Sequence, residues 1–292
     1  MNPLTKIISL TRQRWKSWLF ASVLILAGYY AIATQIDWWL FQFYSGRQAR
    51  SATEVNAKLA SSGLEITPLG VVRYAADSWP ILAASRRVAN PKASLCIFSG
   101  VHGNEPAGVE ATLRWMADLG KSKILYPHVD VLAVPLVNPA GWVHDLRHNG
   151  ENKDIARTFV QGSSQESTLI KGLLGKVHCD LLVDLHEDRY HSAVYLLSYG
   201  ADPAHATALG LARKVRDSGY ALRSAAPDGV YHVAPDKYPE IERATLSLYA
   251  QQHGVAQTFI VETPSKLPMN ERVKVHRLVL DELAKRLNGD GL

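Results

Sequence analysis

Three short polar clusters in this sequence carry histidine or carboxylate side chains. His102 and Glu105 form a His-x-x-Glu pair, His186 closes a mostly apolar run, and Glu262 closes another. Two imidazoles and one carboxylate are the ligand set of a catalytic zinc site with one open position. A further carboxylate beside such a site can take a proton from water. The sequence therefore predicts one Zn²⁺ per chain, held by His102, Glu105 and His186, with Glu262 as the general base.

The His-x-x-Glu spacing alone is weak evidence, because it also occurs at His148 and Glu151. The pair at His102 follows the apolar run 95–98, whereas the pair at His148 lies in a polar stretch that no strand leads into. A single histidine at a strand end is more often part of the scaffold than a ligand. Three strand ends that together carry the residue types of one site favour the metal hypothesis.

Apolar runs of strand length alternate with helical patterns along the chain. Strands are predicted over 94–99, 129–137, 181–185, 193–197 and 258–261, and helices over 106–119, 203–218, 241–253 and 270–287. This order predicts an α/β fold whose mixed or largely parallel sheet is covered by helices on both faces. Ligands of open α/β sheets gather at the carboxyl ends of the strands, which is where the candidate residues lie.

Four motifs give the sequence a family resemblance. In order and spacing they resemble the zinc carboxypeptidase superfamily, which includes aspartoacylase and succinylglutamate desuccinylase. The motifs are HGNEP at 102–106, NPAGW at 138–142, DLHE at 184–187 and VETP at 261–264.

The resemblance covers residues 90–285 and implies a three-layer αβα fold around a mixed, mostly parallel eight-stranded sheet. It also implies that His102, Glu105 and His186 are the zinc ligands and that Glu262 is the catalytic glutamate.

The segment 147–159 resembles the family segment that ends in Asp-Leu-Asn-Arg-Asn-Phe. By this resemblance Arg157 binds a substrate carboxylate, and Arg147 is a candidate for the arginine that polarises the scissile carbonyl. Asn149 is a further candidate for substrate binding. Ala156 departs from the asparagine usual in the family, which removes one amide that would bind a carboxylate.

The N-terminal residues predict that the rest of the chain is exported from the cytoplasm. Residues 18–36 carry no charged side chain and follow a stretch, 1–17, with four basic residues and no acidic one. This pattern predicts a basic cytoplasmic tail and a transmembrane helix, and the rest of the chain outside the cytoplasm. A cleaved signal peptide is the alternative, because residues 31–33 read Ala-Ile-Ala. Residues 37–62 are predicted to be a stalk and residues 63–292 the catalytic domain.

The composition of the chain excludes several classes of protein. The 47% hydrophobic and 20% charged residues exclude a disordered chain. The net charge of +5 comes almost entirely from residues 1–17, so no nucleic-acid partner is expected. Cys96 and Cys179 are too few for a thiolate metal site. We expect them to be buried thiols, with a disulfide between them as the alternative.

These observations predict a zinc-dependent amide hydrolase. The first candidate is a metallocarboxypeptidase that acts on extracytoplasmic peptides with a free carboxylate, such as cell-wall peptides. The second is an N-acyl amino acid deacylase of the succinylglutamate desuccinylase/aspartoacylase type. The third is a zinc-binding or peptide-binding module without catalysis.

Overall fold

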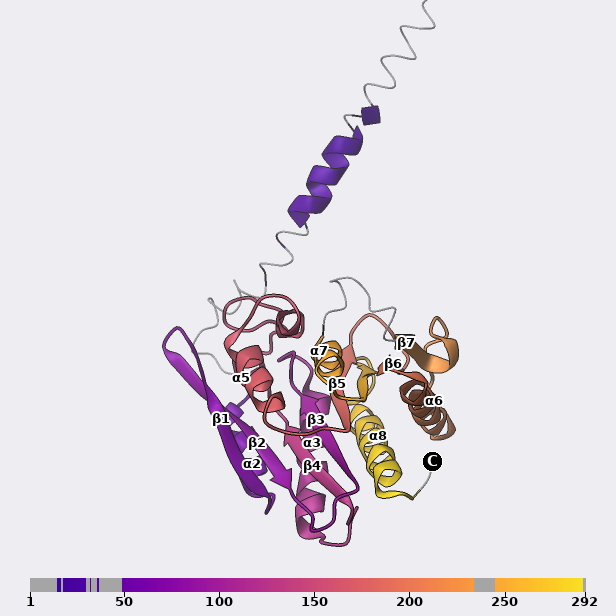
Figure 1. Ribbon diagram of the computed structural model, residues 1–292. Coiled ribbons are helices and arrows are strands. Elements are labelled where there is room, and N and C mark those ends of the chain that lie inside the picture. Colours follow the sequence, from indigo (N-terminus) through magenta and orange to yellow (C-terminus); the bar gives the residue numbers. More distant parts are fainter. Residues whose placement is uncertain are drawn as a thin grey trace, which may run out of the picture.

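A mixed eight-stranded sheet forms the middle layer of the domain (Figure 1). The computed structural model describes residues 15–16, 18–29, 32, 36, 49–233 and 245–290. The strands are β1 (Glu65–Tyr74), β2 (Asp77–Arg86), β3 (Ala93–Ser99), β4 (Val129–Val134), β5 (Leu181–Asp188), β6 (Tyr195–Gly200), β7 (Val230–Val233) and β8 (Gln257–Pro264). Their order in the sheet is β1-β2-β4-β3-β5-β8-β6-β7.

Helices cover both faces of this sheet, which confirms the predicted three-layer αβα architecture. The α-helices are α2 (Ala52–Ala60), α3 (Pro106–Lys121), α4 (Pro139–His144), α5 (Gln165–Leu174), α6 (Asp202–Asp217), α7 (Leu246–Gln252) and α8 (Met269–Asn288), with short 3₁₀ turns at Ile155–Phe159 and Pro227–Gly229. In one layer α8 contacts α3 and α6, and on the other side α5 and α7 contact the turn at Ile155–Phe159.

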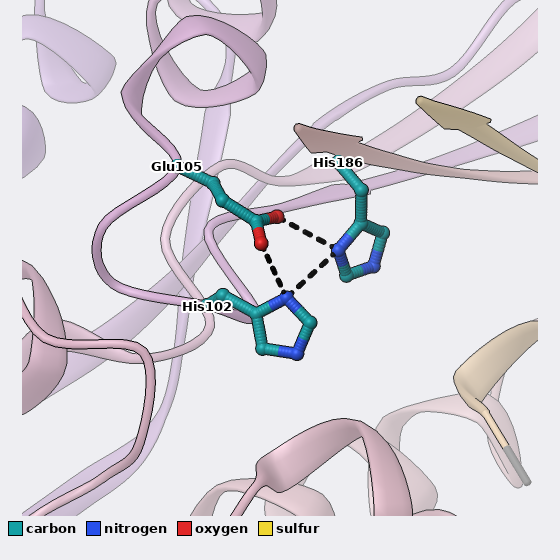
Figure 2. Close-up of side chains that lie close together, drawn as sticks. All are labelled: His102, Glu105 and His186. Atoms are coloured by element: carbon teal, nitrogen blue, oxygen red, sulfur yellow. Dashed lines mark hydrogen bonds and ion pairs between the residues drawn. The ribbon is translucent and has the colours of Figure 1, made fainter. Parts of the chain in front are cut away.

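The strands β4, β3, β5 and β8 run parallel to one another at the centre of the sheet. They are covered on both faces, which explains why they read as nearly continuous apolar runs in the sequence. Parallel strands end at the same edge, and Figure 2 shows that the neighbouring ends of β3 and β5 bring His102 and His186 together. The sheet order therefore places the predicted ligands in one spot.

Elements at the sheet margins differ from the sequence-based prediction. The antiparallel hairpin β1–β2 and the short strand β7 were not predicted. The strand predicted over 129–137 ends at Val134, because Pro139 already begins α4. The helix predicted over 241–253 is observed from Leu246 onward, and residues 241–244 lie outside the described residues.

The segment predicted as a stalk contributes to the folded domain. Residues 37–48 lie outside the described residues, but residues 52–60 form α2. Val55 and Leu59 of this helix are buried in the main hydrophobic core. The domain therefore begins before residue 63, because the apolar face of α2 needs the core to cover it.

The predicted membrane segment, 18–36, is only partly described. Residues 18–29 are helical, whereas residues 17, 30–31 and 33–35 lie outside the described part, as do residues 1–14 of the predicted tail. Within the part of the chain that the structure describes, no helix combines the length and the apolar character that crossing a membrane requires. The structure does not support the predicted transmembrane helix.

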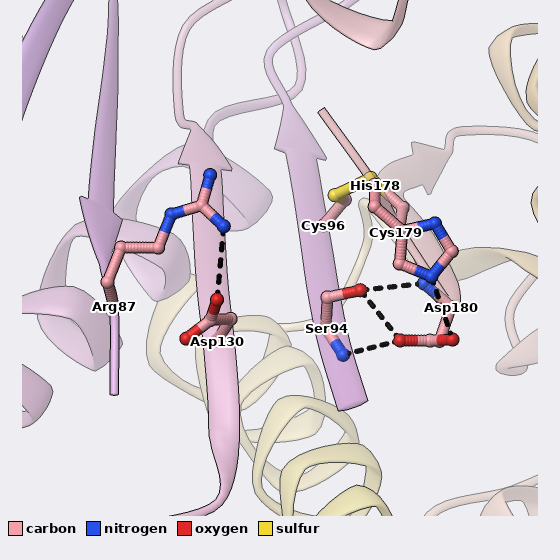
Figure 3. The surroundings of a disulfide bond; sticks show 7 residues. All are labelled: Arg87, Ser94, Cys96, Asp130, His178, Cys179 and Asp180. Atoms are coloured by element: carbon pink, nitrogen blue, oxygen red, sulfur yellow. Dashed lines mark hydrogen bonds and ion pairs between the residues drawn. A yellow bond between two sulfur atoms is a disulfide. The ribbon is translucent and has the colours of Figure 1, made fainter. Parts of the chain in front are cut away.

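The two cysteines form a disulfide rather than the free thiols that we expected (Figure 3). Cys96 lies in β3 and Cys179 just before β5, with their Cα atoms 5.8 Å apart. Beside the bond, the Asp180 carboxylate accepts hydrogen bonds from the backbone nitrogen and the hydroxyl of Ser94. Because β3 and β5 are neighbours in the sheet, the disulfide links the two strands that lead to His102 and His186.

Reduction of this disulfide should destabilise the domain. The cross-link closes a loop of 83 residues, so its loss should lower the free energy of unfolding by about 2–4 kcal/mol. Denaturant unfolding with and without a thiol reductant measures the change. A Cys96→Ala/Cys179→Ala variant should be insensitive to the reductant, and two titratable thiols in the unreduced native protein would contradict the assignment.

Candidate metal centre

The three predicted ligands converge on one point at the carboxyl edge of the sheet (Figure 2). His102 and Glu105 lie in a turn between β3 and α3, where the Glu105 backbone nitrogen donates to the His102 carbonyl. His186 projects from β5. The two carboxylate oxygens of Glu105 lie 2.8 Å from His102 Nδ1 and 2.9 Å from His186 Nδ1. All three residues are buried, with at most 6% exposure.

A carboxylate holds the second ring nitrogen of each histidine. Asp184 Oδ2 lies 2.9 Å from His186 Nε2, and Asp154 Oδ1 lies 3.1 Å from His102 Nε2. Such partners orient the two rings so that each Nδ1 faces the other candidate ligands. Asp184 therefore has the orienting role that its place two residues before His186 suggests.

The donor set fits a divalent cation such as zinc. His102 Nδ1 and His186 Nδ1 lie 3.1 Å apart, and each lies within 2.9 Å of a Glu105 oxygen, so three candidate ligand atoms converge in a buried site. Two nitrogens at this separation can both lie about 2.0–2.1 Å from one zinc ion. The buried carboxylate of Glu105 completes a set of three ligands. Burial opposes its ionisation, but the charges of His102 and His186 outweigh burial and lower the pKa of Glu105.

Tight contact between two loops holds His102 and Arg147 in place. A side chain at Gly103 would put its Cβ 1.9 Å from the carbonyl carbon of Gly141, so only glycine fits where these loops meet. The side chain of Asn138 accepts a hydrogen bond from the Gly141 nitrogen and donates one to the Arg147 carbonyl. The NPAGW motif is thus structural, and it positions Arg147 beside the metal ligands.

An ion pair stabilises the loop that carries His102 and Glu105. Glu187, next to His186, accepts a hydrogen bond from the Ala107 nitrogen at the start of α3 and pairs with Arg272 of α8. Its own backbone nitrogen donates to Glu105 Oε2 at 3.1 Å. These contacts join the strand that carries His186 to the helix that follows Glu105.

Glu262 faces the same site from β8. It is the register partner of His186 in the neighbouring parallel strand, so both side chains point to the same face of the sheet. Burial raises the pKa of Glu262 to about 7, although the positive charge of His186 opposes the shift. A carboxyl group with a pKa near neutrality can accept a proton and later return it.

Arg147 reaches the ligands and is held by two acids. Its guanidinium lies 3.3 Å from Glu105 Oε1 and 3.0 Å from Asp154 Oδ2. Burial lowers the pKa of Arg147, but the charges of Asp154 and Glu105 outweigh burial and raise it, so the group stays charged. Arg147 lines a cavity beside the metal ligands. Arg157 and Ala156 line the same cavity.

Asn149 lies elsewhere. Its side chain is 1% exposed and donates to the Tyr74 hydroxyl and to Glu166, while its oxygen accepts from the Glu151 and Lys153 backbones. Neither cavity beside the metal ligands includes it among its lining residues. The structure therefore gives Asn149 a role in holding its loop, and gives no support to the predicted contact with substrate.

Two cavities meet at the candidate centre. His102, Arg147, Tyr195 and Glu262 line both of them. One cavity has a volume of about 280 Å³ and continues to Arg157, and the other has a volume of about 550 Å³ and continues past Asn104, His148, Arg189 and Tyr190. The reacting bond of a substrate that occupies both cavities would therefore lie at Glu262 and the metal ligands.

Sequence reasoning missed Asp154, which contacts both His102 and Arg147. A signal was present, because the segment 147–159 resembles a family segment that contains an aspartate three residues before its arginine. The second His-x-x-Glu pair does not join the group of metal ligands, as expected. His148 contacts Asn152, and Glu151 pairs with Lys153.

Metal content gives a direct test of the centre. The wild-type protein should bind about one divalent ion per chain, and His102→Ala or His186→Ala should abolish binding because two ligands rarely hold a catalytic ion. Elemental analysis after gel filtration measures the stoichiometry. Chelation should lower stability by about 2.7 kcal/mol or more if the ion is present at 100 times its Kd. His148→Ala is the matched control, and loss of metal in that variant would contradict the assignment.

Comparison with known proteins agrees with this geometry. A family model described as the succinylglutamate desuccinylase/aspartoacylase catalytic domain matches residues 91–271. Carboxypeptidase 2 of Trichophyton rubrum is 33% identical over 112 residues, which are 36% of this chain and 21% of that protein. Probable carboxypeptidase 2 of Trichophyton verrucosum is 31% identical over 36% of this chain and 22% of that one. The chain thus spans about a fifth of the length of the curated relatives that it matches.

Solved structures share the fold. A metallo-carboxypeptidase from Burkholderia cenocepacia has a TM-score of 0.63 and 18% identity, covering 82% of this chain and 69% of that one. A metallo-carboxypeptidase from Pseudomonas aeruginosa, in complex with (2-guanidinoethylmercapto)succinic acid, has a TM-score of 0.63 and 18% identity, covering 79% and 68%. Since the family model spans more than half of the sequence, the chain belongs to the succinylglutamate desuccinylase/aspartoacylase family of the zinc carboxypeptidase-like superfamily.

Proposed function

We propose that this protein is a zinc-dependent metallocarboxypeptidase, which hydrolyses an amide bond next to a free carboxylate of its substrate. One observation carries the proposal: Glu262 and Arg147 line the same two cavities as the metal ligand His102, and Arg157 lines the smaller one. Such a reaction needs a base, a cation beside the metal ligands and a second cation for the substrate carboxylate.

Each residue of the site has its own role in the proposed hydrolysis. A zinc ion bound to His102, Glu105 and His186 would lower the pKa of a water molecule and polarise the scissile carbonyl. Glu262 takes the proton from the attacking water and returns it to the leaving amine. Arg147 is fixed by acids and stays charged, so it stabilises negative charge that develops on the carbonyl oxygen. Arg157 binds the substrate carboxylate through its guanidinium.

The two cavities favour a peptide as substrate. The smaller one suits a single terminal residue, and the larger one leaves room for the chain that precedes it. An N-acyl amino acid is the second candidate, and the match to the succinylglutamate desuccinylase/aspartoacylase model favours it. A binding module without catalysis is disfavoured, because Glu262 lines both cavities beside the metal ligand His102, where only a reaction needs a base.

The Glu262→Gln variant tests the proposal. It should keep its metal and lose about 10²–10⁴-fold in kcat, because general-base catalysis contributes about that much. The measurement is product release from peptides with a free C-terminus, the same peptides with an amidated C-terminus, and N-acetyl and N-succinyl amino acids. Amidation should cost about 10–100-fold in kcat/KM through loss of a charged hydrogen bond.

Glu54→Gln, on the exposed face of α2, is the control and should match the wild type. Release of acyl groups without release of terminal residues would move the protein to the deacylase candidate. Unchanged turnover in Glu262→Gln would contradict the proposed mechanism.

We also propose that the catalytic domain works outside the cytoplasm, bound to the membrane or released after signal cleavage. The disulfide between Cys96 and Cys179 supports this location, since such bonds persist in oxidising compartments. The basic residues before the uncharged stretch 18–36 are typical of exported proteins.

A C-terminal fusion to a phosphatase that folds only in an oxidising compartment tests the location. The full chain should give an active phosphatase in cells, and a chain without residues 1–36 should give an inactive one. Equal activity from the two fusions would contradict export by the N-terminal segment.

A further inference from the structure

A pair of histidines lies apart from the candidate metal centre. His205 is in α6 and His232 is in β7, the edge strand of the sheet that lies beside α6 (Figure 1). Their ring centres are 4.4 Å apart, and the ring planes are inclined by 32°. Neither cavity beside the metal ligands has His205 or His232 among its lining residues. The proposed hydrolysis therefore does not use this pair.

Each ring of the pair has one buried nitrogen without a hydrogen-bond partner among the described residues. These atoms are Nδ1 of His205 and Nε2 of His232. The other nitrogen of His232, Nδ1, lies 2.9 Å from the hydroxyl oxygen of Ser198, a buried residue that is its register partner in β6. This contact orients the His232 ring. A buried polar atom without a partner is costly, so the two nitrogens favour a ligand that both can bind.

The spacing of the two rings fits shared binding of one ion. The ring centres of His102 and His186, the two histidines of the candidate metal centre, lie 4.7 Å apart, and their nearest nitrogens lie 3.1 Å apart. The rings of His205 and His232 are slightly closer than that, so both can reach a single ion. Imidazole nitrogen is a common ligand of zinc, nickel and copper ions.

The charges around the pair favour a cation. Burial and the charge of His205 lower the pKa of His232, and the carboxylate of Asp202 opposes this shift. A ring with a lowered pKa is neutral at pH 7, and the neutral ring is the form that binds a metal ion. Asp202 lies three residues before His205 in α6 and therefore on the same side of the helix. Its negative charge attracts a cation and repels an anion.

We propose that His205 and His232 bind one divalent transition-metal ion, such as Zn²⁺, at a second metal site between α6 and β7. The pair supplies two protein ligands, and water completes the coordination. The candidate catalytic centre supplies three protein ligands. The second site should therefore bind its ion more weakly, fill only under excess ion and lose the ion during gel filtration.

An ion at the second metal site would tie the edge strand to the helix beside it. Neighbouring residues of a strand point to opposite faces of the sheet. Tyr231, the residue before His232, accordingly lines the smaller cavity rather than the histidine pair. The ion would thus hold β7 in place and, with it, the part of the cavity wall that Tyr231 forms. The inference itself does not rest on the proposed function.

Equilibrium dialysis of the full chain against excess free Zn²⁺, followed by elemental analysis, tests the second metal site. The wild type should bind about two ions per chain, and His205→Ala and His232→Ala should each bind about one. The remaining ion should stay bound through gel filtration, which shows that each variant keeps its fold and the catalytic centre. His178→Ala is the matched control, because it removes an exposed histidine that also lies near an aspartate, and it should keep about two ions.

Two results would overturn the inference. They are a single bound ion in the wild type under excess Zn²⁺, and a second ion that persists in both His205→Ala and His232→Ala. The His102→Ala/His186→Ala variant makes the test independent of the catalytic centre. It should still bind about one ion under excess Zn²⁺ and lose it when His205→Ala is added.

Hydrogen exchange tests the same site without any substitution. Excess Zn²⁺ should slow the exchange of the backbone amides of β7 in the wild-type protein, because the ion holds this edge strand against α6. Unchanged exchange in β7, in protein that has taken up the second ion, would contradict the assignment.

Discussion

The meeting of two imidazole nitrogens and one carboxylate at the end of two parallel strands is the constraint on which the site depends. His102 Nδ1 and His186 Nδ1 lie 3.1 Å apart beside Glu105, and all three residues are buried. Three candidate ligand atoms within 4.8 Å of one another match the donor set of one metal ion. The arrangement therefore makes chemical sense as a metal site, and Glu262 and Arg147 gain their functions from lying next to it.

Several contacts around the site hold the side chains of His102, Glu105 and His186 close together. Asp184 and Asp154 hold the outer nitrogens of the histidines, and the pair Glu187–Arg272 ties the strand of His186 to the helix after Glu105. The disulfide between Cys96 and Cys179 joins β3, which leads to His102, to the residues just before β5, which carries His186. Each contact restricts the conformations of the chain. Together the contacts keep the buried, charged side chains of the site in place.

The central part of the fold and the three ligands could be predicted from the sequence, because buried parallel strands leave apolar runs that end in polar residues. The hairpin β1–β2 could not, since its strands contain Pro68 and Pro80 and have largely exposed residues in β1. The disulfide depends on β3 and β5 being neighbours, which no local pattern reveals. The same holds for Arg272, which pairs with Glu187 across 85 residues of sequence.

X-ray absorption spectroscopy at the zinc edge, on the purified zinc-loaded protein, tests the central claim most directly. We predict a first shell of nitrogen and oxygen atoms at about 2.0–2.2 Å, including two imidazoles, and no bound zinc in His186→Ala. A spectrum with sulfur ligands, or one that is the same in His186→Ala as in the wild type, would place the metal elsewhere and contradict the account.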